Sequence, residues 1–296
     1  MAIVIFLLIG AIAQLIDGTL GMAFGITSSS LLVAVGSTPV AASAAVHFAE
    51  LGTTFASGAS HWRARNVDWG IAVRIGAPGA VGAFVGATVL SRISLDGART
   101  WMSVLLVILG LVLLLRFGLG VRTIGTVTRR PRSAALVPLG AVAGFVDASG
   151  GGGWGPITTP TLLTITNSQP RTVIGTVSAA EFFVAVAASG GFLLGSATAG
   201  VDWEVVAGLL LGGVLMAPFA AHLAGRLPHA PFGALIGGVV VVTNVRTLLA
   251  VRQAGDDITV TVLVAIALVV VALAIVAHRR ERRTGVEHSF YETGDD

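Results

Sequence analysis

Long apolar stretches separated by short polar segments dominate the chain. Six of them approach or exceed the ~20 residues that a helix needs to cross the hydrocarbon core of a bilayer. They cover residues 39–60, 70–90, 100–118, 170–196, 204–224 and 258–278, and a seventh stretch covers residues 230–250. The pattern predicts an all-α polytopic membrane protein.

Two further apolar stretches, residues 2–36 and 134–166, are too long for one crossing at about 1.5 Å per residue and have glycines in the middle. The second break reads Asp147-Ala148-Ser149-Gly150-Gly151-Gly152-Gly153-Trp154-Gly155-Pro156. Four glycines followed by a proline predict an unwound backbone and a new helix with Pro156 at its first position. Such backbone is tolerated at membrane depth only where protein buries it or it lines a cavity.

The two halves of the chain match each other in sequence. A shift of 130 aligns Asp17 with Asp147, and shifts of 131 and 134 align Glu50 with Glu181 and Asp68-Trp69 with Asp202-Trp203. The glycines and alanines match as well, Gly10, Ala11, Ala13, Gly21 and Gly25 falling on Gly140, Ala141, Ala143, Gly151 and Gly155. The chain is therefore predicted to be a duplication.

The arginine distribution predicts the topology. The basic segments Arg122–Arg132 and Arg279–Arg283 should both face the cytoplasm, so an even number of crossings separates them. Four ordinary spans and one broken element lie between them. The broken element is then a re-entrant hairpin of two half-helices. Each repeat becomes one hairpin plus three transmembrane helices, and the two repeats are inverted, as in secondary transporters.

These boundaries predict five segments. They are a first repeat (1–118), a basic cytoplasmic linker (119–133), a second repeat (134–251), an additional C-terminal transmembrane helix (252–280) and a charged cytoplasmic tail (281–296). The first fifteen residues also fit the apolar core of a signal peptide, but no basic segment precedes them. Their recurrence in the second repeat argues against cleavage.

Composition excludes several classes of protein. Charged residues make up 11% of the chain, against about 25% in an ordinary globular protein, which argues against a soluble enzyme, a nucleic-acid binder or a disordered scaffold. The chain has no Lys, so it has no nucleotide-binding P-loop, and it has no Cys. No catalytic motif is present. One buried His with scattered carboxylates does not define a metal site, so neither a metal nor a cofactor is expected.

The glycine pattern resembles a known family. The two halves open with the patterns Gly10-x3-Gln14-x2-Asp17-Gly18-x2-Gly21-x3-Gly25 and Gly140-x3-Gly144-x2-Asp147-x2-Gly150-Gly151-Gly152-Gly153. The pattern is similar to that of the TauE/SafE sulfite exporter family over about Ile3 to Val251. The resemblance implies a prokaryotic plasma-membrane carrier that exports sulfite, a sulfonate or another small anion. The first half departs from it, because Leu20-Gly21-Met22-Ala23-Phe24 replaces a pure glycine run, and so does the longer basic C-terminal extension.

The two breaks are the expected substrate site. A half-helix that starts at mid-membrane presents N–H groups and a positive dipole end to an anion, and glycine amides add donors. Alternatively, these small residues only let helices pack closely. Trp154 either walls the cavity or fills space between the hairpins. The candidate substrate-binding residues are Gly21, Gly25, Ser28, Ser29, Gly150, Gly151, Gly152, Gly153, Trp154, Thr158 and Thr159.

Ionisable residues inside the apolar stretches are candidates for proton coupling. Asp17 and Asp147 precede the breaks, Glu50 and Glu181 occupy equivalent positions, and His47 lies one turn before Glu50. A carboxylate beside an anion repels it unless the carboxyl is protonated, which favours a proton over a metal cation. Alternatively, the aspartates cap the broken backbone, and the glutamates satisfy each other or an arginine. Arg74, Arg116 and Arg246 lie near the ends of spans, as is typical of arginines that extend to lipid headgroups. Arg246 has Thr243 and Asn244 nearby and is alternatively a group that helps to neutralise an anion.

The sequence thus predicts a proton-linked secondary transporter in which two repeats rock around a small-anion site. The alternative is a passive anion channel or uniporter with the same glycine-lined pore. The expected partners are the anion, protons and the lipid bilayer, without nucleic acid, and the sequence indicates no oligomeric state.

Overall fold

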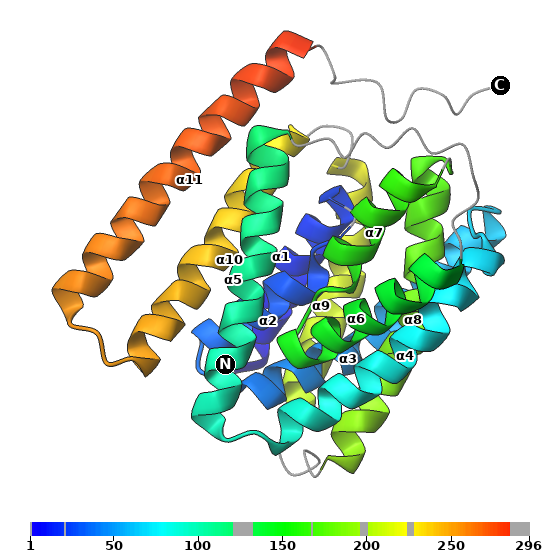
Figure 1. Cartoon of the computed structure of the whole chain (residues 1–296), viewed down its shortest axis with the longest axis horizontal. Helices are drawn as coiled ribbons and strands as arrows, with labels where there is room; N and C mark the ends of the chain where they lie inside the picture. The colour runs from blue at the N-terminus through cyan, green and yellow to red at the C-terminus, as the bar shows by residue number, and fades with distance from the viewer. Residues whose placement is uncertain are drawn as a thin grey trace.

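The computed structural model describes residues 2–20, 22–120, 133–166, 168–195, 201–223 and 228–284. This part of the chain is entirely helical (Figure 1), which confirms the predicted fold class. Its helices are α1 (Ala2–Leu20), α2 (Phe24–Ala34), α3 (Pro39–Arg63), α4 (Trp69–Arg92), α5 (Leu95–Leu119), α6 (Ser133–Gly150), α7 (Trp154–Ile165), α8 (Pro170–Leu194), α9 (Trp203–Leu223), α10 (His229–Val251) and α11 (Asp256–Thr284). The basic segment Arg122–Arg132 lies outside the described residues.

Eight of the described helices are long and apolar enough to cross a membrane: α1, α4, α5, α6, α8, α9, α10 and α11. Helix α3 has 25 residues, a length of roughly 37 Å. It is not among the eight, because polar side chains such as Ser43, His47 and Glu50 interrupt its apolar sequence. All three of these side chains are buried, so α3 presents them to the interior of the protein.

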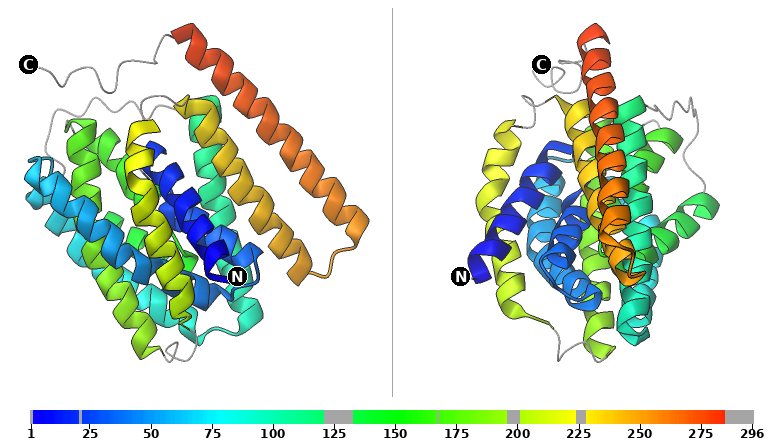
Figure 2. Two further views of the ribbon diagram at one scale, coloured as in Figure 1. Left: turned by 180° about the vertical axis from the view of Figure 1, so that it is seen from behind. Right: turned by 90° about the vertical axis from the view of Figure 1, so that its left-hand side faces the viewer.

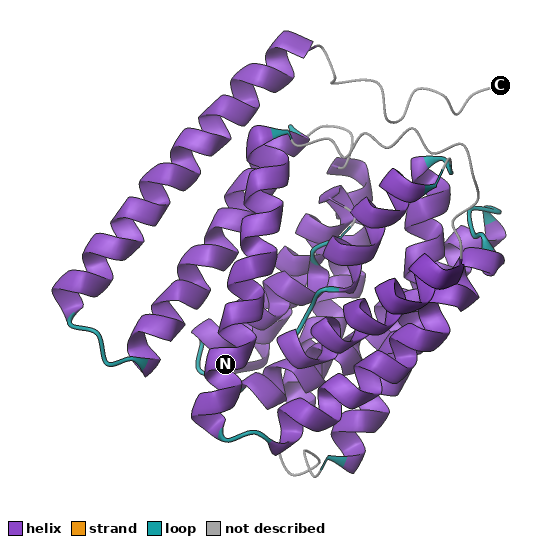
Figure 3. Ribbon diagram, in the orientation of Figure 1, coloured by secondary structure: helices purple, strands orange, loops and turns teal. Residues whose placement is uncertain are grey.

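Both broken elements are interrupted where the glycines predicted. Helix α1 ends at Leu20 and α2 begins at Phe24, while α6 ends at Gly150 and α7 begins at Trp154. Figure 3 shows the two connecting loops near the middle of the bundle. The second loop needs glycine, because φ is +74° at Gly151 and +145° at Gly152. The prediction for Pro156 was wrong by two residues, since α7 begins at Trp154 and the proline occupies its third position.

Each broken element has the shape of a hairpin. In both views, α2 turns back toward the side of the molecule where the chain begins (Figures 1 and 2). Helices α2 and α7 are short, with 11 and 12 residues, whereas α1 and α6 are each long enough to span a membrane alone. Re-entry into the membrane therefore stays a prediction.

The halves of the chain are interleaved. Helix α1 packs along α9, and α6 packs along α4. Glycines let each pair approach closely, because a Cβ on Gly10 would lie 2.4 Å from the Leu209 carbonyl oxygen and one on Gly140 would lie 2.1 Å from that of Ile75. Gly10 and Gly140 are equivalent in the sequence alignment, as are Leu209 and Ile75. These contacts fit two repeats related by a twofold axis, and the duplication itself stays a prediction.

The last helix lies at the edge of the bundle (Figure 2). Helix α11 packs mainly against α10 and α5, and only 17% of its apolar stretch is buried inside the protein. Near its C-terminal end, an Arg280 Nη2 donates a hydrogen bond to the Phe117 carbonyl oxygen at 3.2 Å. The basic end of α11 therefore lies beside the end of α5, from which the basic linker continues.

Candidate functional site

A cavity of about 80 Å³ lies where the two breaks meet. Residues of α1, α2, α3, α6, α7 and α8 line it together with both loops. The charged lining residues are Asp17, Glu50, Asp147 and Glu181. The cavity is large enough for several water molecules or one small oxyanion. The structure thus brings together all four carboxyl groups that the sequence singled out, from positions up to 164 residues apart (181 − 17).

The two aspartates hold the broken backbone. An Asp17 Oδ1 accepts hydrogen bonds from the N–H groups of Ala23 at 2.7 Å and Phe24 at 3.1 Å, and Asp147 Oδ1 accepts one from Trp154 at 3.0 Å. Each carboxyl group thereby fixes the first turn of the short helix that follows its break. These three amides were expected to face an anion, but they are occupied by the protein itself.

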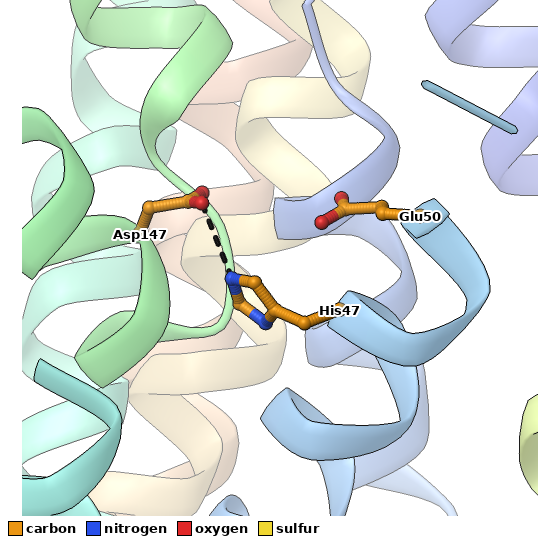
Figure 4. Close-up of side chains that lie close together, drawn as sticks. All are labelled: His47, Glu50 and Asp147. Atoms are coloured by element: carbon orange, nitrogen blue, oxygen red, sulfur yellow. Dashed lines mark hydrogen bonds and ion pairs between the residues drawn. The ribbon is translucent and has the colours of Figure 1, made fainter. Parts of the chain in front are cut away.

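The second aspartate also contacts a buried histidine (Figure 4). The Oδ2 atom of Asp147 lies 3.2 Å from Nε2 of His47, which is fully buried. On the other side of the ring, Nδ1 lies 2.7 Å from the Ser43 carbonyl oxygen. That oxygen can only accept, so Nδ1 carries a proton. Nε2 of a neutral ring then presents its lone pair to Asp147, so a hydrogen bond forms at this contact when one of the two side chains carries a further proton.

Glu50 completes this buried group. It lies one helical turn after His47 on α3, and Figure 4 shows its carboxyl group pointing toward the same space. The ligand atoms of His47, Glu50 and Asp147 lie within 4.8 Å of one another. Glu50 is 4% exposed, and its carboxylate has no hydrogen-bond partner among the described residues. The arrangement can store a proton, and its three ligand types could also hold a cation.

The glycines of the breaks serve mainly to bring the two loops together. A Cβ on Gly25 would lie 2.9 Å from Cα of Gly152, and one on Gly152 would lie 2.3 Å from the Ile26 nitrogen. Gly25 and Gly153 line the cavity, whereas Gly150 lies against Leu105. Gly21 lies outside the described residues.

Comparisons with known proteins identify the family of this chain. The model of the family described as "Sulfite exporter TauE/SafE" matches residues 6–247. The chain belongs to the TauE/SafE family. It is 45% identical to "Probable membrane transporter protein YtnM" of Bacillus subtilis (strain 168) over 248 residues, which cover 83% of each chain. No solved structure matches it. The protein is thus a multi-pass membrane transporter of this family.

The hydroxyl groups that the sequence assigned to the substrate do not line the cavity of this TauE/SafE protein. A hydroxyl of Ser29 donates to the carbonyl oxygen of Gly151, and Thr158 donates to that of Trp154. The hydroxyls of Ser28 and Thr159 are buried without a partner among the described residues. Two of the four therefore bind protein backbone, and Ser29 links α2 directly to the second break.

Trp154 is fully buried and is not among the lining residues. Its Nε1 donates to the Val177 carbonyl oxygen at 3.1 Å, and its ring leaves no room for a side chain on Gly79, where a Cβ would lie 2.6 Å away. This placement fits the space-filling alternative.

Five polar lining residues were not among the predicted substrate-binding or proton-coupling residues: Gln14, Thr53, Thr54, Ser57 and Ser178. The Thr54 hydroxyl donates to the Glu50 carbonyl oxygen. The other four side chains make no hydrogen bond within the described residues, so their donors are available to a ligand. A signal was present, because Thr53, Thr54 and Ser57 follow Glu50 at offsets of three, four and seven residues. That spacing places them on one face of α3.

Proposed function

We propose that this TauE/SafE-family protein exports a small anion, such as sulfite or a sulfonate, together with or in exchange for protons, by alternating access between two inverted repeats. The observation that carries the proposal is the buried contact between His47 Nε2 and Asp147 Oδ2, next to a small cavity lined by carboxyl groups. The anion class and the outward direction rest on the family and on its sulfite exporter description.

Charge balance favours proton coupling. The cavity is lined by Asp17, Glu50, Asp147 and Glu181, and no arginine lines it. In a low-dielectric interior, an anion beside several carboxylates is strongly repelled. Protonation removes that repulsion, so binding of the anion and binding of protons are thermodynamically linked. The proposed coupling residues remain Asp17, His47, Glu50, Asp147 and Glu181.

The cavity also offers neutral donors that suit an oxyanion. The amide of Gln14 and the hydroxyls of Thr53, Ser57 and Ser178 line it without partners among the described residues. Among the predicted substrate residues, Gly25 and Gly153 line it too. Gly21 lies outside the described residues. We propose that the remaining candidates shape the site from behind rather than contact the anion: Ser28, Ser29, Gly150, Gly151, Gly152, Trp154, Thr158 and Thr159.

The geometry supports rocking of the repeats. Asp147 fixes the start of α7 through one oxygen and contacts His47 of α3 through the other. A proton at this contact therefore joins an element of the first half to the break of the second half. Loss of this proton places the lone pair of His47 Nε2 against the Asp147 carboxylate. The contact between the two halves of the chain is then weaker, which favours a different arrangement of the halves.

The first experiment is counterflow in proteoliposomes preloaded with sulfite, sulfate, thiosulfate, small sulfonates or carboxylates, with one labelled anion measured at two pH values. We expect saturable counterflow that depends on pH. Flux without counterflow would indicate a channel. Flux that depends on added Zn²⁺ or Mn²⁺ and is lost with a chelator would indicate that the His47 group holds a metal instead of a proton.

Replacing Glu181 with Gln should flatten the pH profile of counterflow. In the wild type, raising the pH charges the carboxyl group, repels the anion and weakens its apparent affinity by about tenfold per pH unit where one proton is linked. The amide is neutral at every pH, so the half-saturation concentration should rise less steeply with pH, by the contribution of the one proton that Glu181 binds. Glu204→Gln at the exposed start of α9 is the matched control. An unchanged profile in Glu181→Gln removes this residue from coupling.

A further inference from the structure

Arg116 is a cation inside the bundle that the site described above does not use. It lies on α5, one turn before the helix ends at Leu119, and its side chain is half-buried. An arginine that extends to lipid headgroups would direct its guanidinium away from the protein interior. Instead, the Nη1 atom of Arg116 lies 3.7 Å from Sδ of Met22 in the first break.

The contacts of Arg116 are weak for a guanidinium. The guanidinium of Arg116 also lies over the ring of Phe117, whose centroid is 5.7 Å from Cζ. No carboxylate pairs with it among the described residues. A guanidinium has five N–H donors, and a thioether sulfur is a weak acceptor. Most of its donor capacity is therefore available to an anion.

Met22 connects Arg116 with the central cavity, because it contacts the guanidinium and lines the cavity. It is only 9% exposed. Its backbone is wedged against the start of α7, since a Cβ on Gly155 would lie 3.0 Å from Cα of Met22. Met22 thus touches a cavity lined by four carboxyl groups and no arginine, and also a guanidinium that pairs with no carboxylate of the described residues.

We propose that Arg116 binds the transported anion on the path between the central cavity and the end of the bundle where α5 ends, and that the Met22 side chain closes this path. The inference rests on the proposed anion transport and adds a residue that determines its anion selectivity. The predicted topology places this end, beside the basic linker and the basic end of α11, in the cytoplasm. Arg116 then collects an anion from the side on which an exporter loads.

The functional consequence follows from charge. An anion at Arg116 gains charge-assisted hydrogen bonds without facing a carboxylate. Movement of the flexible thioether of Met22 then opens the way to the cavity, where protonated carboxyl groups and neutral donors take over. A single cation ahead of the gate also excludes cations from this entrance.

The test measures the half-saturation concentration of sulfite, in proteoliposomes with the α5 end accessible, for the wild type, Arg116→Gln, Arg116→Lys and Arg74→Gln. Arg74 is the matched control, because it is an exposed arginine on α4. Arg116→Gln should raise the half-saturation concentration about 10- to 100-fold, the loss of one or two charge-assisted hydrogen bonds. Arg116→Lys should raise the half-saturation concentration less than Arg116→Gln does. The pH profile should not change, because Arg116 does not exchange protons.

A second variant tests the gate. Met22→Ala should allow sulfite flux without a counter-substrate, and adding Arg116→Gln should reduce that flux. Equal half-saturation concentrations for Arg116→Gln and Arg74→Gln would overturn the proposal. So would an effect of Arg116→Gln that appears only in vesicles with anionic lipid, since Arg116 would then bind headgroups.

Failure of anion transport itself is distinguishable. If the wild type moves none of the anions, sulfite-dependent thermal stabilisation of the detergent-solubilised protein still tests Arg116. Stabilisation that Arg116→Gln abolishes supports this binding site without the transport cycle. Stabilisation that Arg116→Gln leaves intact overturns the site alone, and no stabilisation of the wild type overturns both proposals.

Discussion

Asp147→Asn is expected to abolish pH-driven accumulation of the anion while leaving counterflow at symmetrical pH measurable. The amide preserves the geometry, since Oδ1 still accepts from the Trp154 N–H and Nδ2–H donates to the lone pair of His47 Nε2. The amide cannot ionise, so residue 147 no longer takes up or releases a proton at this contact. With a gradient of one pH unit, the wild type should accumulate the anion about tenfold for each coupled proton, because one pH unit is worth ~1.36 kcal/mol.

The control for Asp147→Asn is Asp68→Asn. Asp68 also accepts a hydrogen bond from the first turn of a helix, at 3.1 Å from the Ile71 nitrogen, but it is exposed at the start of α4. The Asp68→Asn variant should retain full pH-driven accumulation of the anion. Full accumulation by Asp147→Asn would contradict the coupling role. Asp147→Ala separates coupling from folding, because the unpaired Trp154 N–H should reduce the free energy of unfolding by about 1–3 kcal/mol.

Gly152→Ala is expected to have the largest effect on stability, reducing the free energy of unfolding by about 2–5 kcal/mol. The residue has φ of +145°, which disfavours a side chain. Its new Cβ would lie 2.3 Å from the Ile26 nitrogen and 2.5 Å from the Gly25 carbonyl carbon, so the backbone of one break must move away from the other. The effect is measured by thermal unfolding in detergent, which is monitored as the loss of the peak of monodisperse protein.

Gly190→Ala is the matched control for this substitution. Gly190 lies inside α8, and a Cβ there meets nothing within 4 Å. Since alanine favours a helix by up to about 1 kcal/mol over glycine, the control should be neutral or stabilising. If Gly152→Ala proves as stable as Gly190→Ala, close contact between the two breaks does not hold the site together.

Much of the fold could be predicted from the sequence. Apolar stretches of about twenty residues report membrane helices directly, because the bilayer imposes their length. Glycines in the middle of both long apolar stretches predicted the interruptions, and side chains disfavour φ values such as the +145° of Gly152. Equivalent positions in the two halves also selected Glu50 and Glu181, which line one cavity in the structure.

Other features depend on contacts between helices that are distant in sequence. Nothing in the sequence indicates that His47 of α3 would meet Asp147 at 3.2 Å, or that Ser43 would fix the tautomer of the ring. Both contacts depend on how α3 crosses the second break. Likewise, the position of Arg116 in the sequence is typical of an arginine directed to lipid headgroups. Only the packing of the helices shows that it contacts Met22.

The sequence by itself therefore determined the helices, the breaks and the carboxyl groups, because hydrophobic length, backbone freedom and residue type are local properties. Only the tertiary structure decided how each group is used. It assigned backbone amides to the aspartates instead of an anion, placed most of the glycines at the contact between the breaks, and set a cation against Met22, which lines the acidic cavity. Hydrogen-bond partners and charge neighbours are properties of the packed bundle, and no spacing along the chain encodes them.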